Sequence, residues 1–231
     1  MFQLSPDETA AIGLSLKVAV VAVATSLPFG LAIAWMLARR RFPGIALVEG
    51  LVHLPLTLPP VVTGYLLLLL CGHQGLIGKF LESHFGIVFA FRWTGAALAA
   101  AVMGFPLMVR AMRLALESVD ERFEEAASTL GAAPAWVYLT VTLPLMGPGI
   151  VSGAILSFAR AMGEFGATIT FVSNIPGQTQ TLAMAIYTFT QIPEGDASAL
   201  RLVLVSIAIS IAALIVSEWI ERRGRRRTRG H

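Results

Sequence analysis

The segment SVDERFEEAASTLGAAPAWVYLTVTLP, residues 118–144, is a polar insert between two long apolar runs of the chain. Ser118 and Glu121 have the S-x-x-E spacing of a capping box, in which side chains satisfy the free backbone amides at a helix start. Gly131 is placed to end this helix in a left-handed cap, and Pro134 suits the first turn of a following helix. The segment therefore predicts a helix, a sharp corner and a second helix.

The first of these helices is predicted to be amphipathic and acidic. Its apolar residues fall at helical spacing on one face, and they are Val119, Phe123, Ala126, Ala127 and Leu130. Its acids point mostly elsewhere, and they are Asp120, Glu121, Glu124 and Glu125. Helices that lie on a lipid surface are normally basic, because anionic lipid attracts them. A protein groove that contains arginines is therefore the better partner.

The composition is that of an integral membrane protein. Of the 231 residues, 56% are hydrophobic and only 13% are charged, which is too apolar for a water-soluble domain of this length. Cys71 is the single cysteine, so one chain can assemble neither a disulfide nor a thiolate metal site. Residues 1–10 lack the Lys or Arg of a cleavable signal peptide, and the first apolar segment is expected to persist as a helix.

Five transmembrane helices are predicted, because a span needs about 20 mainly apolar residues. Four stretches meet this need cleanly, at 11–38, 93–116, 145–172 and 200–220. A fifth, 47–71, carries Pro55, Pro59 and Pro60, which remove backbone donors and should kink or unwind it. The short apolar piece 181–192 is expected to be a re-entrant or external half-helix. We predict an all-α membrane protein with one domain, 1–231, and a cytoplasmic loop at 117–144.

The orientation follows from the basic residues, since Lys and Arg near span ends resist translocation. Most of them fall on one side of the five-span arrangement, namely Arg39, Arg40, Arg41, Arg110, Arg113, Arg122, Arg222, Arg223, Arg225, Arg226, Arg227 and Arg229. The other side holds Lys17, Lys79, Arg92 and Arg201. The N-terminus is therefore predicted to be external and the C-terminus cytoplasmic. The arginine tail is expected to anchor on anionic membrane lipid rather than to bind nucleic acid.

The polar insert resembles the EAA loop of ABC importer permeases, Glu-Ala-Ala-x3-Gly-x9-Ile-x-Leu-Pro. The matching residues are Glu125-Ala126-Ala127, Gly131 and Val141-Thr142-Leu143-Pro144, with Val141 in the place of Ile. The resemblance implies a MetI-like fold and a coupling helix, within residues 118–135, that inserts into a cleft on an ATP-binding subunit. It implies that the contacts to that subunit are made by Glu121, Phe123, Glu124, Glu125, Ala126, Ala127, Leu130, Gly131, Leu143 and Pro144.

Two further stretches, LPLTLPPVV at 54–62 and GEFGATITFVSNIPG at 163–177, resemble the molybdate branch of these permeases. That branch is close to the tungstate, sulfate and thiosulfate permeases, which remain alternatives, although the compact length favours molybdate. The resemblance implies an inner-membrane homodimer that works with an external molybdate-binding protein. It also implies that ATP and Mg bind to the partner subunit and that this chain binds no cofactor.

Candidate pathway residues lie in the second and fourth spans. Arg160 and Glu164 would each cost about 2.5 to 3.5 kcal/mol at mid-membrane, so they need partners, and their spacing lets them pair with each other. The pair either fixes helix packing or forms a gate, and both interpretations stay open. Pro59 and Pro60 free backbone groups that a pathway wall could receive. Thr57 and Thr63 could donate hydroxyls to an oxyanion, although threonines in membrane helices more often bond their own backbone.

Other functional classes are less well supported. A channel or secondary transporter that works without ATP would need several intramembrane carboxylates or repeats, and only Glu164 and Glu218 are available. A membrane-embedded enzyme would need clustered nucleophiles, bases or ligands. The histidines are dispersed, so a metal site is not predicted. Gly78-Lys79-Phe80 lacks the flanking residues of a P-loop, so ATP hydrolysis is expected on another polypeptide.

Overall fold

The computed structural model describes residues 4–228, which form helices joined by loops and contain no strand. In chain order the helices are α1 (Pro6–Arg39), α2 (Ile45–Thr57), α3 (Pro60–Cys71), α4 (Leu76–Phe85), α5 (Trp93–Glu117), α6 (Glu121–Thr129), α7 (Pro134–Val137), a π-helical turn (Tyr138–Thr142), α8 (Leu143–Leu145), α9 (Gly147–Met162), α10 (Gly166–Val172), α11 (Leu182–Thr190) and α12 (Asp196–Thr228). Among the described residues, α1, α5 and the Asp196–Val216 part of α12 are each long and apolar enough to cross a membrane. Two bent helix pairs raise the number of candidate spans to five, which confirms the predicted fold class.

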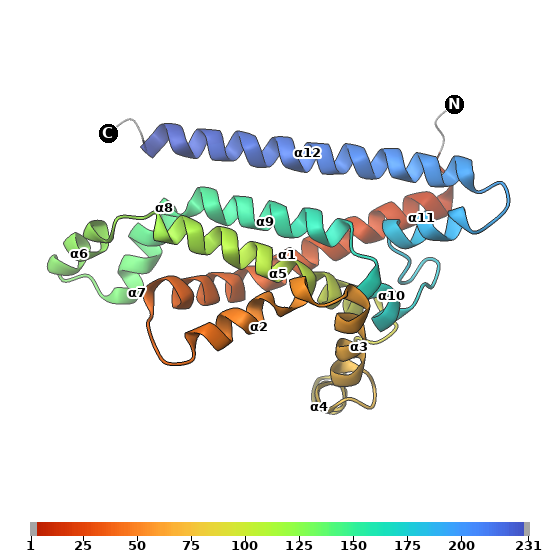
Figure 1. Cartoon of the computed structure of the whole chain (residues 1–231), viewed down its shortest axis with the longest axis horizontal. Coiled ribbons are helices and arrows are strands. Elements are labelled where there is room, and N and C mark those ends of the chain that lie inside the picture. Colours follow the sequence, from red (N-terminus) through yellow and green to blue (C-terminus); the bar gives the residue numbers. More distant parts are fainter. Residues whose placement is uncertain (1–3, 229–231) are drawn as a thin grey trace.

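The centre of the bundle is built from α1, α5 and α9, which pack side by side (Figure 1). Small residues line the contacts, because without a hydrophobic driving force in lipid the helices gain most from close van der Waals approach. A Cβ on Gly153 of α9 would lie 3.0 Å from the carbonyl oxygen of Met108, and a Cβ on Gly104 of α5 would collide with the Ser157 hydroxyl. The fully buried alanines Ala19, Ala96 and Ala99 continue this pattern.

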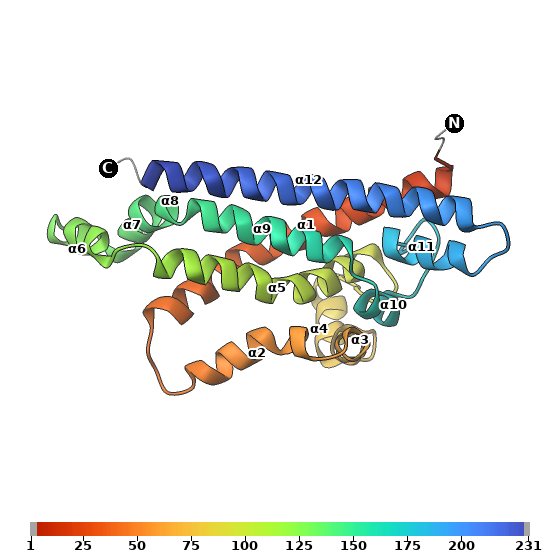
Figure 2. The same cartoon turned by 45° about the horizontal axis from the view of Figure 1, so that its top comes forward.

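The second predicted span is broken rather than kinked. Helices α2 and α3 meet at 115° at Leu58 and Pro59, so α3 turns sharply off the line of α2 and lies beside α10 and α4 (Figure 2). Pro59 and Pro60 explain the position of the break, because neither can donate a backbone hydrogen bond to the preceding turn. Pro55, by contrast, lies inside α2 without ending it. Helix α4 was not predicted from the sequence.

The fourth predicted span, 145–172, is divided into α9 and α10 by residues 163–165. A further bend of 70° separates Pro134–Leu145 from α9. The predicted span is therefore broken close to Gly163 and Gly166, glycines that permit a local break in a helix. The reason is local: Glu164 caps the first turn of α10 with its own side chain, which favours a new helix start over continuation.

The two ends of the bundle differ in which segments they gather. The turn after α1, the α6–α7 corner and the C-terminal end of α12 lie at one end, while the start of α1 and α11 lie at the other (Figure 1). At the latter end, Arg201 of α12 pairs with the fully buried Glu8 of α1 at 2.6 Å. Helix α11 has only nine residues, in the region predicted as a half-helix. The arginine tail that is predicted to anchor on lipid lies at the C-terminal end of the chain. Its side chains are outside the part of the chain that the structure describes, and so is the backbone of Arg229.

Candidate functional site: a corner at the end of the bundle

The α6–α7 corner begins two residues later than the sequence predicts. Helix α6 starts at Glu121, and its N-cap is Asp120, whose Oδ1 accepts a hydrogen bond from the Arg122 amide at 3.0 Å. Ser118 instead ends α5, where its hydroxyl donates to the Ala115 carbonyl at 2.6 Å. The predicted capping box at Ser118 is therefore wrong. Helix α5 continues through Glu117 and takes Ser118 into its last turn, which leaves the cap to the next short polar side chain.

The turn after α6 has the conformation that the sequence predicts. Gly131 has a φ of +87°, the left-handed conformation that glycine adopts without penalty. The Gly131 amide donates to the Ser128 carbonyl at 3.0 Å and the Ala132 amide to the Ala127 carbonyl at 3.3 Å, which together form a Schellman motif. Pro134 is the first residue of α7. A Cβ at Gly131 would meet no atom of the described chain within 4 Å, so the glycine faces open space.

The side chains of the corner divide into an inner and an outer set. Glu124 and Ala127 are half-buried against the bundle, and every other residue of α6 is exposed. Phe123 is 58% exposed and Leu130 is 89% exposed, which is unusual for such large apolar groups outside a lipid contact. Glu125 and Ala126 are also exposed, and the Glu125 carboxylate has no hydrogen bond or ion pair within residues 4–228. Trp136 of α7, which sequence reasoning missed, adds a third large apolar side chain to this outer surface.

The remaining members of the predicted coupling set lie further inside. Leu143 is half-buried and packs with the core cluster that includes Met108 and Met146. Pro144 is exposed in the first turn of α8. These two residues follow the corner and connect it to α9, so they support it rather than extend its outer surface.

An ion-pair network, which sequence reasoning missed, holds the inner side of α6. The Arg39 guanidinium at the end of α1 contacts Glu121 at 2.6 Å and Glu124 at 3.1 Å. The same Oε1 of Glu124 accepts a hydrogen bond from the Thr142 hydroxyl at 2.8 Å. Two of the acids predicted to contact another subunit are thus engaged within this chain. The segments that meet here lie far apart in sequence, and no local pattern brings Arg39 to them.

The predicted Arg160–Glu164 pair forms, with Arg160 Nη1 lying 2.6 Å from Glu164 Oε2. The other carboxylate oxygen accepts a hydrogen bond from the Ala167 amide at 2.8 Å, in the first turn of α10. The Glu164 side chain is 2% exposed and that of Arg160 is 26% exposed. Glu164 therefore uses both oxygens to hold α10 at the break after α9.

Helix α10 packs directly on α3, so the breaks in the second and fourth spans meet. A Cβ on Gly166 would lie 2.8 Å from the Cβ of Pro60, and a Cβ on Gly64 would lie 2.8 Å from the Cα of Ala167. Pro59 is exposed at the cap of α3. The structure thus packs Pro60 against α10, the helix whose first turn Glu164 caps, although the sequence places these residues in separate spans.

The two candidate threonines differ in their bonding. Thr57 is exposed, and its hydroxyl donates to the Leu54 carbonyl at 2.9 Å, so it bonds its own backbone. Thr63 in α3 is 5% exposed, and its Oγ1 has no hydrogen-bond partner among the described residues. A buried hydroxyl without a partner costs free energy, so Thr63 is the one of the two that is available for another contact.

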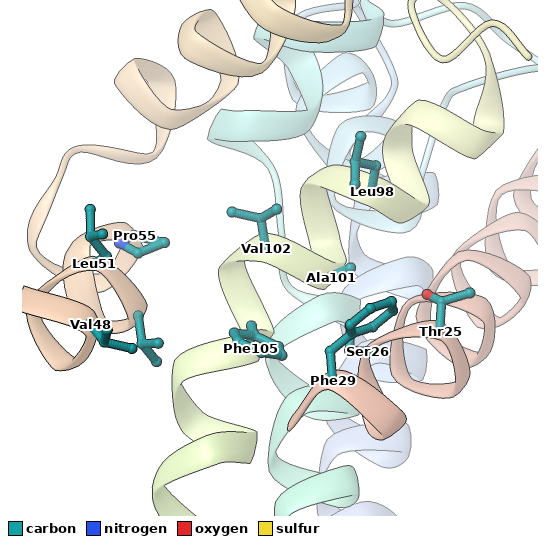
Figure 3. Close-up of a pocket in the computed structure, with 11 residues that line it drawn as sticks. Thr25, Ser26, Phe29, Val48, Leu51, Pro55, Leu98, Ala101, Val102 and Phe105 are labelled. Carbon is teal, nitrogen blue, oxygen red and sulfur yellow. The ribbon is translucent and has the colours of Figure 1, made fainter. Parts of the chain in front are cut away.

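A cavity of about 500 Å³ lies between α1, α2 and α5. Figure 3 shows Val48, Leu51 and Pro55 of α2 across the cavity from α5. Its lining contains no charged residue, and the hydroxyls of Thr25 and Ser26 donate to carbonyls of their own helix. The cavity therefore offers nothing to stabilise an oxyanion.

Comparison with known proteins identifies close relatives over nearly the whole chain. Residues 26–226 match the family described as binding-protein-dependent transport system inner membrane component. The molybdenum transport system permease protein of Escherichia coli (strain K12) is 58% identical over 224 residues, which cover 97% of this chain and 98% of that protein. A sulfate transport system permease protein of Salmonella typhimurium is 37% identical, and the alignment covers 98% of this chain and 81% of the Salmonella protein. A chain of the MetNI methionine ABC transporter in an inward-facing conformation has the same fold, with a TM-score of 0.68 and 16% sequence identity. The superposition covers 93% of this chain and 94% of the MetNI chain.

Proposed function

This chain belongs to the binding-protein-dependent transport system inner membrane component family, and we propose that it is the permease subunit of an importer that moves molybdate across the inner membrane at the expense of ATP. The substrate rests on one observation, the 58% identity to a molybdenum permease across nearly the full length of both chains. Identity to the sulfate permease is lower, at 37%. Tungstate, sulfate and thiosulfate are therefore the competitors that a transport assay must include.

The outer surface of the α6–α7 corner is the proposed docking site for the ATP-binding subunit. Phe123, Leu130 and Trp136 project large apolar side chains from a polar surface, and Glu125 adds a charge without a partner in residues 4–228. Apolar anchors surrounded by polar groups are typical of protein interfaces. The open space at Gly131 lets a partner approach the backbone of the corner closely.

Two copies of the chain are proposed to form the translocation path. Helices α2 and α3 leave most of their apolar side chains uncovered, among them Leu51, Val61, Tyr65 and Leu69, each more than half exposed. A second copy and membrane lipid would cover them. An ATP-binding subunit with its own ATP and Mg would dock on each copy, and an external molybdate-binding protein would deliver the substrate. Rigid-body switching between two states is sufficient to expose the path alternately.

The corner is proposed to face the cytoplasm, with the N-terminus outside and the C-terminus inside. The clustering of Arg39, Arg40 and Arg41 at the same end as the corner supports this orientation, because basic residues are retained on the cytoplasmic side. Glu8 and Arg201, at the opposite end, neutralise each other.

The junction of α3 with α10 is proposed as part of the pathway wall. Thr63 carries a buried hydroxyl available to a passing oxyanion. Arg160 and Glu164 are proposed to position α10 at this junction, because one oxygen of Glu164 contacts Arg160 and the other accepts a hydrogen bond from the Ala167 amide.

Co-purification with the ATP-binding subunit tests the docking site. Glu125→Lys and Gly131→Asn are expected to reduce recovery of that subunit at least about tenfold, a cost of roughly 1.4 kcal/mol each in binding. Asparagine tolerates the left-handed conformation, so the second variant adds bulk without distorting the corner. Glu82→Lys, which makes the same charge change in α4, is the control and should bind normally. Normal recovery of the subunit by both corner variants would refute the docking site.

Uptake in reconstituted vesicles tests the substrate. Molybdate uptake should require ATP and the binding protein, and excess sulfate should compete poorly. A preference for sulfate over molybdate would overturn the substrate assignment while leaving the docking site intact.

A further inference from the structure

Arg39 occupies a junction between three elements of the fold. It is the last residue of α1, and its side chain is 13% exposed. One guanidinium nitrogen contacts Glu121 at 2.6 Å, and the other contacts Glu124 at 3.1 Å and the Val119 carbonyl at 3.4 Å. A single planar side chain thus holds the connection into α6 and the first turn of α6 together, a geometry that suits arginine and not lysine.

Glu124 extends the junction to the fourth span. Its Oε1, which contacts Arg39, also accepts the hydrogen bond from Thr142, a residue only 1% exposed in the π-helical turn that leads to α8 and α9. The Glu124 side chain is 26% exposed, whereas that of Glu121 is 69% exposed. The Glu124 contact is therefore the less screened of the two and contributes more to holding α6.

Apart from its short link to α5 through residues 118–120, helix α6 has few contacts that fix its position relative to the spans. It has nine residues, none of them buried, and it packs against α7 and the π-helical turn. A helix this short is marginal without tertiary contacts. The first span reaches α6 through the Arg39 side chain, so this polar junction determines how movement of α6 is shared with α1 and α9.

We propose that Arg39 is the positioning residue that transmits movement of the corner to the first and fourth spans. This inference rests on the proposed docking of an ATP-binding subunit on the outer surface of the corner. While the junction is intact, a displacement of α6 carries α1 through Arg39 and α9 through Glu124 and Thr142. Without it, the loops on either side of α6 absorb the displacement, and ATP is hydrolysed without transport.

The test uses the complete importer in vesicles, with molybdate uptake and ATP hydrolysis measured together. Arg39→Gln and Glu124→Gln should each lower molybdate taken up per ATP by about tenfold, within the range typical of coupling between sites. Arg39→Lys should recover part of this loss, because one ammonium can contact one of the two carboxylates. Arg40→Gln is the matched control: it removes the neighbouring positive charge, which lies over the Trp35 ring rather than on α6, and should leave the ratio unchanged.

The outcomes separate this inference from the proposed function. If Arg39→Gln has the same uptake per ATP as Arg40→Gln, or if it fails because the ATP-binding subunit no longer associates, the positioning role is wrong. If the Arg39→Gln protein does not accumulate, Thr142→Val is the second test, because it removes the contact to the fourth span without changing charge. A normal ratio of molybdate uptake to ATP hydrolysis in Thr142→Val would also refute the inference. Failure of the native chain to bind any ATP-binding subunit would instead refute the proposed function.

Discussion

Gly64 of α3 and Ala167 of α10 touch through their backbones, and the contact leaves no room for a side chain at residue 64. The broken second span and the broken fourth span are joined at this point. Close approach of two helix backbones in a membrane requires small residues, and glycine allows the closest. The proposed pathway wall therefore depends on a residue that carries no functional group.

Replacement of Gly64 by alanine should destabilise the permease by about 1 to 3 kcal/mol, because an added methyl group must displace the backbone of α10. Thermal unfolding in detergent measures this. Gly50→Ala in α2 is the matched control, since a Cβ there meets nothing within 4 Å, and it should leave stability unchanged or slightly raised. Equal melting temperatures for the two variants would contradict the described contact.

Replacing either Arg160 or Glu164 alone by Gln should lower the free energy of unfolding by up to about 3 kcal/mol. This is the low end of the cost of breaking a buried ion pair, because Arg160 is partly exposed. The double variant Arg160→Gln/Glu164→Gln should lose less than the sum of the singles, since two amides can still hydrogen-bond each other. We expect uptake to recover along with stability. A stable double variant that transports nothing would instead show that the charges act directly in gating.

The same substitution at the two threonines should change the KM for molybdate at Thr63 but not at Thr57. Thr63→Val removes a hydroxyl that has no partner among the described residues, so it should leave stability intact but raise the KM for molybdate uptake several-fold. Thr57→Val removes a hydroxyl that bonds the Leu54 carbonyl, and it should leave KM unchanged. An unchanged KM in Thr63→Val would remove this residue from the pathway.

Local features of the fold could be predicted from the sequence. Long apolar runs marked the spans because lipid leaves the backbone no alternative to a helix. Gly131 and Pro134 marked the corner, since each is favoured at one particular position of a helix end. The prediction of a capping box at Ser118 was wrong because Ser118 and Asp120 are both good N-cap residues. Which of them caps α6 depends on where α5 ends.

Features that depend on distant residues could not be predicted. The junction of Arg39 with Glu124 and Thr142 joins three elements, and nothing near Arg39 in sequence indicates its partners. The meeting of α3 with α10 likewise follows from two breaks more than a hundred residues apart, at Pro59 and Gly163. Prolines indicate the first break and glycines permit the second, but the Glu164 carboxylate that caps the new helix is seen only in the structure.

Side-specific labelling at Ala126 most directly tests whether the corner docks on a cytoplasmic ATP-binding subunit. Cys71, the single native cysteine, is buried, so Ala126→Cys supplies the only exposed thiol. A membrane-impermeant maleimide should label this variant in inside-out vesicles but not in right-side-out vesicles, and added ATP-binding subunit should block the labelling. Labelling in right-side-out vesicles would place the corner outside the cell and contradict the proposed docking.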